Sequence, residues 1–324
     1  MYLLDPQKPM YKAALHFHSD CSDGKPTVEE WKTALKEHGY AIAAYTDHEH
    51  LLDHSELNDE SFLAITSCEL AVKEIEEASS LDNQTMRVCH LNIYTPDPHD
   101  TLTPCYSSVY DHFIKNDAAR AQVRFDGEYH RVYSGEGVRD IIARAHERGF
   151  LVSYNHPQWS LEDARQYLEY RTVDFVEVYN HGTARNGMDT YAPAMLDEFL
   201  REGADVRATM CDDAHSLANA FGGWCVINAD ALTYEAVFAA LREKRFYASQ
   251  GPEILELTRE DDTVRIRTSP CRMIALSTGS RHYKAERGTA VTEAVFTLKP
   301  TDRYFRLTVT DEGGYHAMTQ AYPV

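Results

Sequence analysis

Histidine and acidic side chains recur between residues 16 and 215 in positions that could bind metal ions. His16 and His18 are separated by one residue, and in an extended strand this spacing places both imidazoles on the same face. Two imidazoles at one strand end form a natural clamp for a divalent cation. A single pair of this kind is weak evidence in a chain with 16 histidines. The evidence grows because six further predicted strands also finish with polar side chains, and the fourth strand of the seven is expected to end at His90. These side chains are Asp47, His48, Glu69, His90, Asn155, His156, Asn180, Asp213 and His215.

The elements that would position these side chains follow from the hydrophobic pattern. Short apolar, β-prone runs alternate with amphipathic helical segments from residue 10 to about residue 250. Thr27 and Glu30 have the spacing of a capping box, and Gly39 is placed to end the helix that they begin. Strands are predicted over residues 12–18, 41–46, 62–69, 87–94, 150–155, 175–179 and 206–211.

Strands that alternate with helices are typical of a parallel sheet covered by helices, and seven such strands favour an α/β fold of the TIM-like barrel type, slightly irregular. Barrel enzymes carry their chemistry at the carboxyl ends of the strands, where the polar residues are predicted to lie. No Gly-x-Gly-x-x-Gly motif and no Walker loop is present, which weakens the alternative of an open nucleotide-binding sheet. We therefore expect a metal centre at the mouth of a barrel.

After residue 250 the pattern changes to the two-residue period of strands, at 264–267, 295–298 and 304–309. The segment 251–324 holds ten basic and ten acidic residues, so the first 250 residues carry the whole net charge of −19. We predict a hydrolase barrel over residues 1–250 and a small, β-sandwich-like, all-β subdomain over residues 251–324. The simplest role for that subdomain is a rigid lid or packing element.

The composition, with 43% hydrophobic and 26% charged residues, is that of a globular protein. The net charge of −19 opposes binding to duplex nucleic acid, which depends on clustered Lys and Arg. No long apolar run predicts a membrane span, and the first residues lack the apolar core of a signal peptide, so we expect a cytoplasmic protein. Seven scattered cysteines without a Cys-x-x-Cys pair indicate reduced thiols. No pattern in the sequence specifies an oligomeric state.

The ordered motifs resemble those of the PHP (polymerase and histidinol phosphatase) family over roughly residues 11–250. They are His16-Phe-His18-Ser-Asp-Cys-Ser-Asp23-Gly, Thr46-Asp-His48, Glu69, His90, Asn155-His156-Pro and Asp213-Ala-His215. The resemblance implies a distorted seven-stranded β/α barrel that binds two or three divalent metal ions. Manganese, zinc and iron all occur in the family, and mixed nitrogen and oxygen ligation does not choose among them.

Carried over position by position, the resemblance assigns nine metal ligands. One metal would take His16, His18, Glu69 and Asp213; a second would share Glu69 and add His90 and His156; a third would take Asp23, His48 and His215. Asp23 stands where other members of the family have His. Three carboxylates against as many as six metal charges would leave the centre positive, which favours a small anionic substrate.

The resemblance implies a metal-dependent phosphoesterase that hydrolyses a small phosphate ester by means of a metal-bridging hydroxide. The nucleotide phosphatases and exonucleases of the family carry a sizeable helical insertion between the positions of His90 and His156, and the short interval here indicates that this chain lacks it. A carboxylester or carbamate hydrolase that uses the same centre is the alternative, because the same hydroxide can attack a carbonyl. A non-enzymatic metal-binding module is a third possibility, which the intact ligand set disfavours.

Three further residues are candidates for catalysis. His50 is a possible proton donor to the leaving group or an outer ligand, and a solvated loop histidine is the plain alternative. His181 and Arg185 follow the sixth predicted strand and are placed to meet the substrate, with Arg185 as a phosphate clamp. Asp47, Asn155 and Asn180 are expected either to orient imidazoles or to make ordinary strand-end hydrogen bonds.

Overall fold

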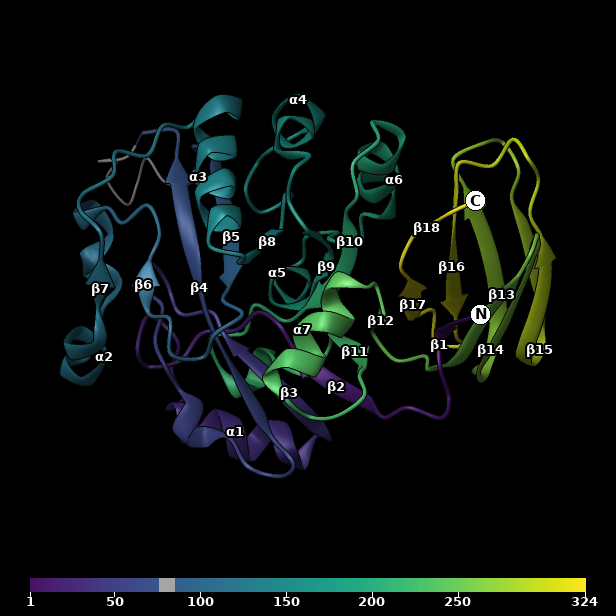
Figure 1. Cartoon of the computed structure of the whole chain (residues 1–324), viewed down its shortest axis with the longest axis horizontal. Helices are drawn as coiled ribbons and strands as arrows, with labels where there is room; N and C mark the ends of the chain where they lie inside the picture. Colours follow the sequence, from purple (N-terminus) through teal and green to yellow (C-terminus); the bar gives the residue numbers. More distant parts are fainter. Residues whose placement is uncertain (76–84) are drawn as a thin grey trace.

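The computed structural model describes residues 1–75 and 85–324, and its centre is a run of seven neighbouring strands (Figure 1). All seven strands predicted from the sequence are present. In sheet order they are β2 (Met10–Ala14), β3 (Tyr40–Tyr45), β4 (Leu63–Lys73), β5 (Val88–Tyr94), β8 (Leu151–Tyr154), β9 (Phe175–Asn180) and β10 (Arg207–Cys211). The two ends of this run also approach each other, because Phe17 and Ala214 form a parallel bridge just after β2 and β10.

The direction of β5 differs from the sequence-based expectation. The pairs β2–β3, β3–β4, β8–β9 and β9–β10 are parallel, but β5 runs antiparallel to both β4 and β8. Lys73 at the end of β4 stands opposite Val88 at the start of β5, so the two strands pair in opposite directions. The prediction that the fourth strand ends at His90 is therefore wrong. His90 lies near the start of β5, and the reversal brings that end of the strand to the carboxyl ends of its neighbours.

Helices cover this run through apolar faces. The longer ones are α1 (Val28–Glu37), α3 (Gly135–Glu147), α6 (Pro193–Arg201) and α7 (Tyr234–Arg242). The predicted capping box of α1 is confirmed, since Thr27 and Glu30 exchange side-chain to backbone hydrogen bonds, and Gly39 follows the helix with φ 77°. The shorter elements are α2 (Asp117–Gln122), α4 (Ala164–Tyr167), α5 (His181–Arg185), η1 (Ser55–Leu57), η3 (Ser108–Phe113), η4 (Leu168–Tyr170) and η5 (Leu217–Asn219).

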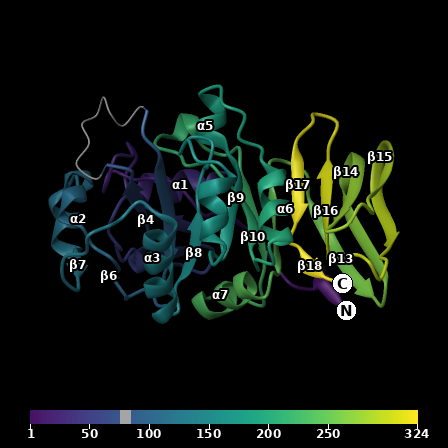
Figure 2. The same cartoon turned by 90° about the horizontal axis from the view of Figure 1, so that it is seen from above.

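Residues 251–324 contain strands and no helix, and they lie to one side of the molecule (Figure 2). The strands are β13 (Ile254–Glu260), β14 (Thr263–Thr278), β15 (Lys284–Thr297), β16 (Tyr304–Thr310), β17 (His316–Thr319) and β18 (Tyr322–Pro323). Their inward residues form a hydrophobic cluster separate from that of the seven strands. The two parts share one continuous sheet, so the change of pattern in the sequence does not mark a break in hydrogen bonding.

The continuity depends on short strands that the sequence-based prediction did not include. They are β1 (Tyr2–Leu4), which pairs with β13, and β11 (Trp224–Asn228) and β12 (Phe246–Ser249), which link β2 to β17. A separate pair, β6 (Leu102–Thr103) and β7 (Arg124–Phe125), lies between β5 and α3 in the chain. Among the residues that the structure describes, no helix combines the length and the hydropathy that crossing a bilayer requires.

Candidate metal centre

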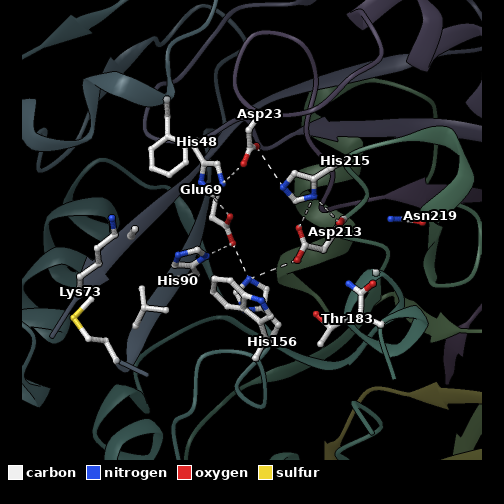
Figure 3. A pocket seen from close by; sticks show the side chains of 17 residues that line it. Asp23, His48, Glu69, Lys73, His90, His156, Thr183, Asp213, His215 and Asn219 are labelled. Carbon is white, nitrogen blue, oxygen red and sulfur yellow. Dashed lines mark hydrogen bonds and ion pairs between the residues drawn. The ribbon is translucent and has the colours of Figure 1, made fainter. Parts of the chain in front are cut away.

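All nine predicted ligands meet at one end of the seven-strand run, and Figure 3 shows the seven that line a cavity there. A cavity of about 480 Å³ opens there. Seven of the nine line it, while His16 and His18 lie just beneath and are fully buried. The ligands are contributed by the segments after β2, β3, β8 and β10 and by β4 and β5 themselves. The strand ends thus bring residues distant in sequence together, as expected for a site at the carboxyl ends of parallel strands.

The Glu69 carboxylate is at the centre of the group. Its two oxygens lie within 3.5 Å of ring nitrogens of five different histidines, which approach from both sides of β4. Oε1 is 3.2 Å from His16 Nε2, 3.2 Å from His90 Nδ1 and 3.1 Å from His156 Nε2, and Oε2 is 3.5 Å from His18 Nε2 and 3.4 Å from His48 Nδ1. One carboxylate in contact with two sets of imidazoles has the geometry of a bridge between two cation positions.

The other two carboxylates extend the group on either side. Asp213 Oδ1 lies 3.2 Å from His18 Nε2 and 3.4 Å from His16 Nε2. Asp23 Oδ1 lies 3.3 Å from His215 Nε2, and Asp23 Oδ2 lies 3.6 Å from His48 Nε2. The ligand atoms fall into four overlapping groups: His16–His18–Glu69, Glu69–His90–His156, His18–Asp23–His48–His215 and His16–His156–Asp213.

Several imidazole nitrogens in this group have no hydrogen-bond partner among the described residues. They are His16 Nε2, both ring nitrogens of His18, His48 Nδ1 and His90 Nδ1, all of them buried. A buried polar group without a partner is costly, at about 1–3 kcal/mol for each atom. Cations between the imidazoles and the carboxylates would satisfy these nitrogens, so the residues present fit a cluster of divalent metals.

Burial and the mutual contacts of the imidazoles and carboxylates shift the pKa values of several members of the group. Burial and the neighbouring His18 lower the pKa of His48 to about 3, which keeps its imidazole neutral and able to coordinate. Burial opposes ionisation of Glu69, but the surrounding imidazoles, His90 and His16 first, hold the pKa of this carboxyl well below its usual range. Burial would also lower the pKa of His215, yet the Asp23 and Asp213 carboxylates raise it to about 9.

Glu177, for which no role was predicted, orients one of the candidate ligands. Its Oε1 lies 2.5 Å from His16 Nδ1, so the opposite ring nitrogen of His16 points to Glu69 and Asp213. Its Oε2 accepts hydrogen bonds from the His156 backbone N–H at 3.0 Å and from Asn180 Nδ2 at 3.2 Å. A buried acid inside the apolar run of β9 was the available signal. A carboxylate behind a metal-binding imidazole fixes its tautomer and its orientation.

The three other polar strand-end residues contact groups other than imidazoles. Asn155 Nδ2 donates to Glu69 Oε1 at 2.8 Å, and Asn180 Nδ2 lies 3.3 Å from Asp213 Oδ2. Both amides therefore orient the carboxylates of the centre. Asp47 instead accepts hydrogen bonds from the loop that follows His18, through Ser19 and Ser22.

None of the three candidate catalytic residues lines the cavity. His50 is buried, its Nε2 is 3.8 Å from Asp111 Oδ1, and burial and Arg131 lower its pKa to about 4. The side chain of His181 packs on Gly222, where an added Cβ would stand 2.1 Å from Nδ1. Arg185 is exposed at the end of α5.

Other residues that the sequence analysis did not single out form the cavity walls. The α5 segment contributes Gly182, Thr183 and Asn186 to the cavity wall, and Asn219 also lines the cavity. Lys73 is the one Lys or Arg among the described lining residues. The Phe113 ring lies 4.3 Å from that of His48, and the Trp159 ring lies 5.0 Å from that of His156.

Phe113 belongs to the interval between β5 and β8, which the sequence analysis expected to lack a large helical insertion. Apart from α3, its helical elements η3 and α2 are six residues each. The short element η3 is sufficient to place the Phe113 ring against the candidate ligand His48.

No protein-family model matches the sequence, and no curated protein matches it. Solved structures with similar folds include a two-domain protein from Bacteroides vulgatus containing a predicted PHP-like metal-dependent phosphoesterase, at 13% identity and a TM-score of 0.47 over 99% of this chain and 96% of that one. A lesion-specific endonuclease from Pyrococcus furiosus has 14% identity and a TM-score of 0.42 over 72% of this chain and 56% of that one. Structural similarity of this extent shows neither a family nor an activity for this chain. Proteins with PHP-like metal-dependent phosphoesterase domains are among those that this chain resembles.

Proposed function

We propose that this chain is a metal-dependent phosphoesterase that hydrolyses a small phosphate ester. The observation that carries the proposal is the Glu69 carboxylate among five imidazoles, at the floor of a cavity. Four of these imidazoles have a buried ring nitrogen without a hydrogen-bond partner among the described residues. The donors are nitrogen and oxygen only, as expected for manganese, iron or zinc. The seven strands would form the distorted barrel around this centre, with residues 251–324 as a small all-β subdomain.

The nine ligands would hold two or three divalent ions in the sets that the family resemblance implies. Such ions lower the pKa of a bound water and offset the negative charge that develops at phosphorus. The protein's own residues would hold the geometry: Glu177 fixes the ring of His16, and Asn155 and Asn180 fix the carboxylates of Glu69 and Asp213. These contacts preorganise the centre before the substrate arrives.

The cavity walls would select a small anionic substrate. Lys73 supplies one positive charge, while Thr183 and Asn219 offer polar groups on the side near Asp213 (Figure 3). Asn186 also lines the cavity. Trp159 and Phe113 flank the ligands and would exclude water from the reacting group. Because His50, His181 and Arg185 do not line the cavity, roles for them would have to be indirect.

Hydrolysis of a carboxylester or carbamate is a second candidate function. It is favoured by one feature of the cavity, whose described lining contains a single Lys and no Arg, so no bidentate phosphate clamp is present there. The same metal-activated water could attack a carbonyl carbon, and the cations would stabilise the oxyanion.

One comparison of substrates tests the proposal. The purified chain, stripped of metal and reconstituted with manganese, iron or zinc, is assayed on p-nitrophenyl phosphate, bis-p-nitrophenyl phosphate and p-nitrophenyl acetate. We expect metal-dependent release of p-nitrophenol from one or both phosphate esters. Turnover of the acetate alone would replace the phosphoesterase by the second candidate, and no metal-dependent turnover at all would indicate a binding module.

A further inference from the structure

A second group of potential metal ligands lies behind the centre, and it includes sulfur. Cys21 Sγ, an oxygen of Asp47 and a ring nitrogen of His54 lie within 4.8 Å of one another. Asp47 and His54 are buried, and Cys21 is half-buried. None of the three was assigned to the nine-ligand centre. Among the residues that the structure describes, no other cysteine belongs to a group of this kind.

The His54 imidazole is the strongest sign of a missing ligand. Its Nε2 has no hydrogen-bond partner among the described residues, and it is shielded from water because His54 is only 4% exposed. The ring packs on Tyr45 at 5.0 Å between centroids, which fixes its orientation. The other ring nitrogen, Nδ1, lies 3.7 Å from Glu56 Oε1. A buried nitrogen without a partner costs about 1–3 kcal/mol, so the unpartnered Nε2 requires an explanation.

The other two side chains retain capacity for a ligand. Asp47 Oδ1 accepts two hydrogen bonds, from the Ser19 N–H at 2.8 Å and the Ser22 hydroxyl at 2.6 Å. Its Oδ2 accepts one, from the Ser19 hydroxyl at 2.6 Å. An ionised carboxylate has about four acceptor positions, so one remains on Oδ2. Asn116 Nδ2 lies 3.7 Å from the Cys21 sulfur, a long contact that leaves other lone pairs of the sulfur available.

We propose that Cys21, Asp47 and His54 bind one further zinc ion, separate from the nine-ligand centre. A thiolate, an imidazole and a carboxylate are a ligand set that suits zinc, with solvent as a fourth ligand at the half-buried Cys21 side. Binding replaces the S–H bond of Cys21 by a sulfur–metal bond and releases the proton to solvent. The ion would link the loop that carries Asp23 to the segment that follows His48. It would thereby stabilise the positions of Asp23 and His48, two candidate ligands of the main centre.

Cobalt(II) distinguishes this site from the main centre, because only this site offers sulfur. The full chain is stripped of metal and titrated with cobalt chloride while the near-ultraviolet absorption is recorded. We expect a thiolate-to-cobalt charge-transfer band whose final intensity corresponds to one cobalt–thiolate bond per chain. The band should be lost in Cys21→Ser and should persist in Cys271→Ser, whose sulfur lies among the C-terminal strands. Metal analysis should find one zinc fewer in Cys21→Ser than in the natural chain.

A second measurement needs no variant. Zinc should slow the alkylation of Cys21 by iodoacetamide at least tenfold, as followed by peptide mass spectrometry. Absence of the cobalt band, a band that survives Cys21→Ser, or equal alkylation of Cys21 with and without zinc would each overturn the proposal. These readouts do not depend on turnover, so the zinc site and the proposed phosphoesterase activity can fail separately.

Discussion

At the scale of single residues, Glu69 is the side chain on which most of the centre depends. Its two oxygens face imidazoles from five positions, so its removal takes a ligand from two of the proposed cation sites at once. We expect Glu69→Ala to reduce kcat/KM on the best p-nitrophenyl substrate about 1,000-fold or more, which corresponds to roughly 4 kcal/mol of lost transition-state stabilisation. Elemental analysis of the variant should find less metal than in the natural chain.

The matched control for this variant is Glu60→Ala, which removes an exposed glutamate from a turn. It should keep both the metal content and the rate. Retention of all metal and a near-normal rate in Glu69→Ala would contradict the bridging role of this carboxylate.

Glu177 contacts His16 Nδ1 and so acts on the centre through the orientation of the His16 ring. Glu177→Gln keeps the shape of the side chain but removes the negative charge that holds His16 Nδ1. Loss of such a partner typically lowers metal affinity 10–100-fold. We expect a weakening within this range when the variant is titrated with manganese or zinc, with activity restored in part at high metal concentration. Glu169→Gln, at an exposed position, is the control, and an unchanged metal affinity in Glu177→Gln would remove Glu177 from the centre.

At the scale of elements, the sequence predicted the strands better than it predicted their directions. Apolar runs set by burial revealed all seven strands, and the helix cap at Thr27 was recognisable because its chemistry is local. The reversal of β5 was not visible, since a two-residue period is the same in either direction. His90 was nevertheless placed correctly at the centre, because the antiparallel strand brings its opposite end to the same edge.

The candidate site shows the same division between local and non-local information. The resemblance of short motifs to those of a known family was enough to predict that the nine candidate ligands lie together. The lining contributed by α5 could not, because a single helical turn decides that Thr183 and Asn186 reach the cavity while Arg185 does not. Contacts of Phe113 and Trp159 with the ligands depend on how loops fold over the sheet, which periodicity does not encode.

The loop between β8 and α4, which carries His156 and Trp159, is anchored at one buried carboxylate. Glu162 accepts hydrogen bonds from the hydroxyls of Tyr133, Tyr154 and Tyr170, each at 2.7 Å. Glu162→Ala would leave these phenols without their acceptor, and we expect a loss of about 2–4 kcal/mol in the free energy of unfolding by urea. A loss of less than about 0.5 kcal/mol, the range typical of surface substitutions such as the control Glu60→Ala, would show that the three tyrosines do not anchor the loop.

At the scale of the whole molecule, the C-terminal strands complete the sheet of the N-terminal part. β17 pairs with β12, and Met318 packs in the hydrophobic cluster of the seven strands, not in that of its neighbours in sequence. The bidentate pair between Arg306 on β16 and Asp197 on α6 adds a charged link across the boundary, with distances of 2.9 and 2.7 Å. The two parts are therefore expected to unfold together, in a single urea transition.

Gln320 makes the most specific of these connections. Its side-chain Oε1 accepts from the Ala208 N–H at 2.7 Å, and its Nε2 donates to the Ala208 carbonyl at 3.0 Å, so a single amide caps β10 as a neighbouring strand would. Gln320 and Ala208 are both fully buried. Gln320→Ala should lower the free energy of unfolding by about 2–4 kcal/mol, because two buried backbone groups lose their partners. The control Glu312→Ala, in an exposed turn, should change it by less than about 0.5 kcal/mol. If both variants unfold at the same urea concentration as the natural chain, the C-terminal strands do not stabilise the sheet through this amide, and their attachment depends on apolar packing and the Arg306–Asp197 pair.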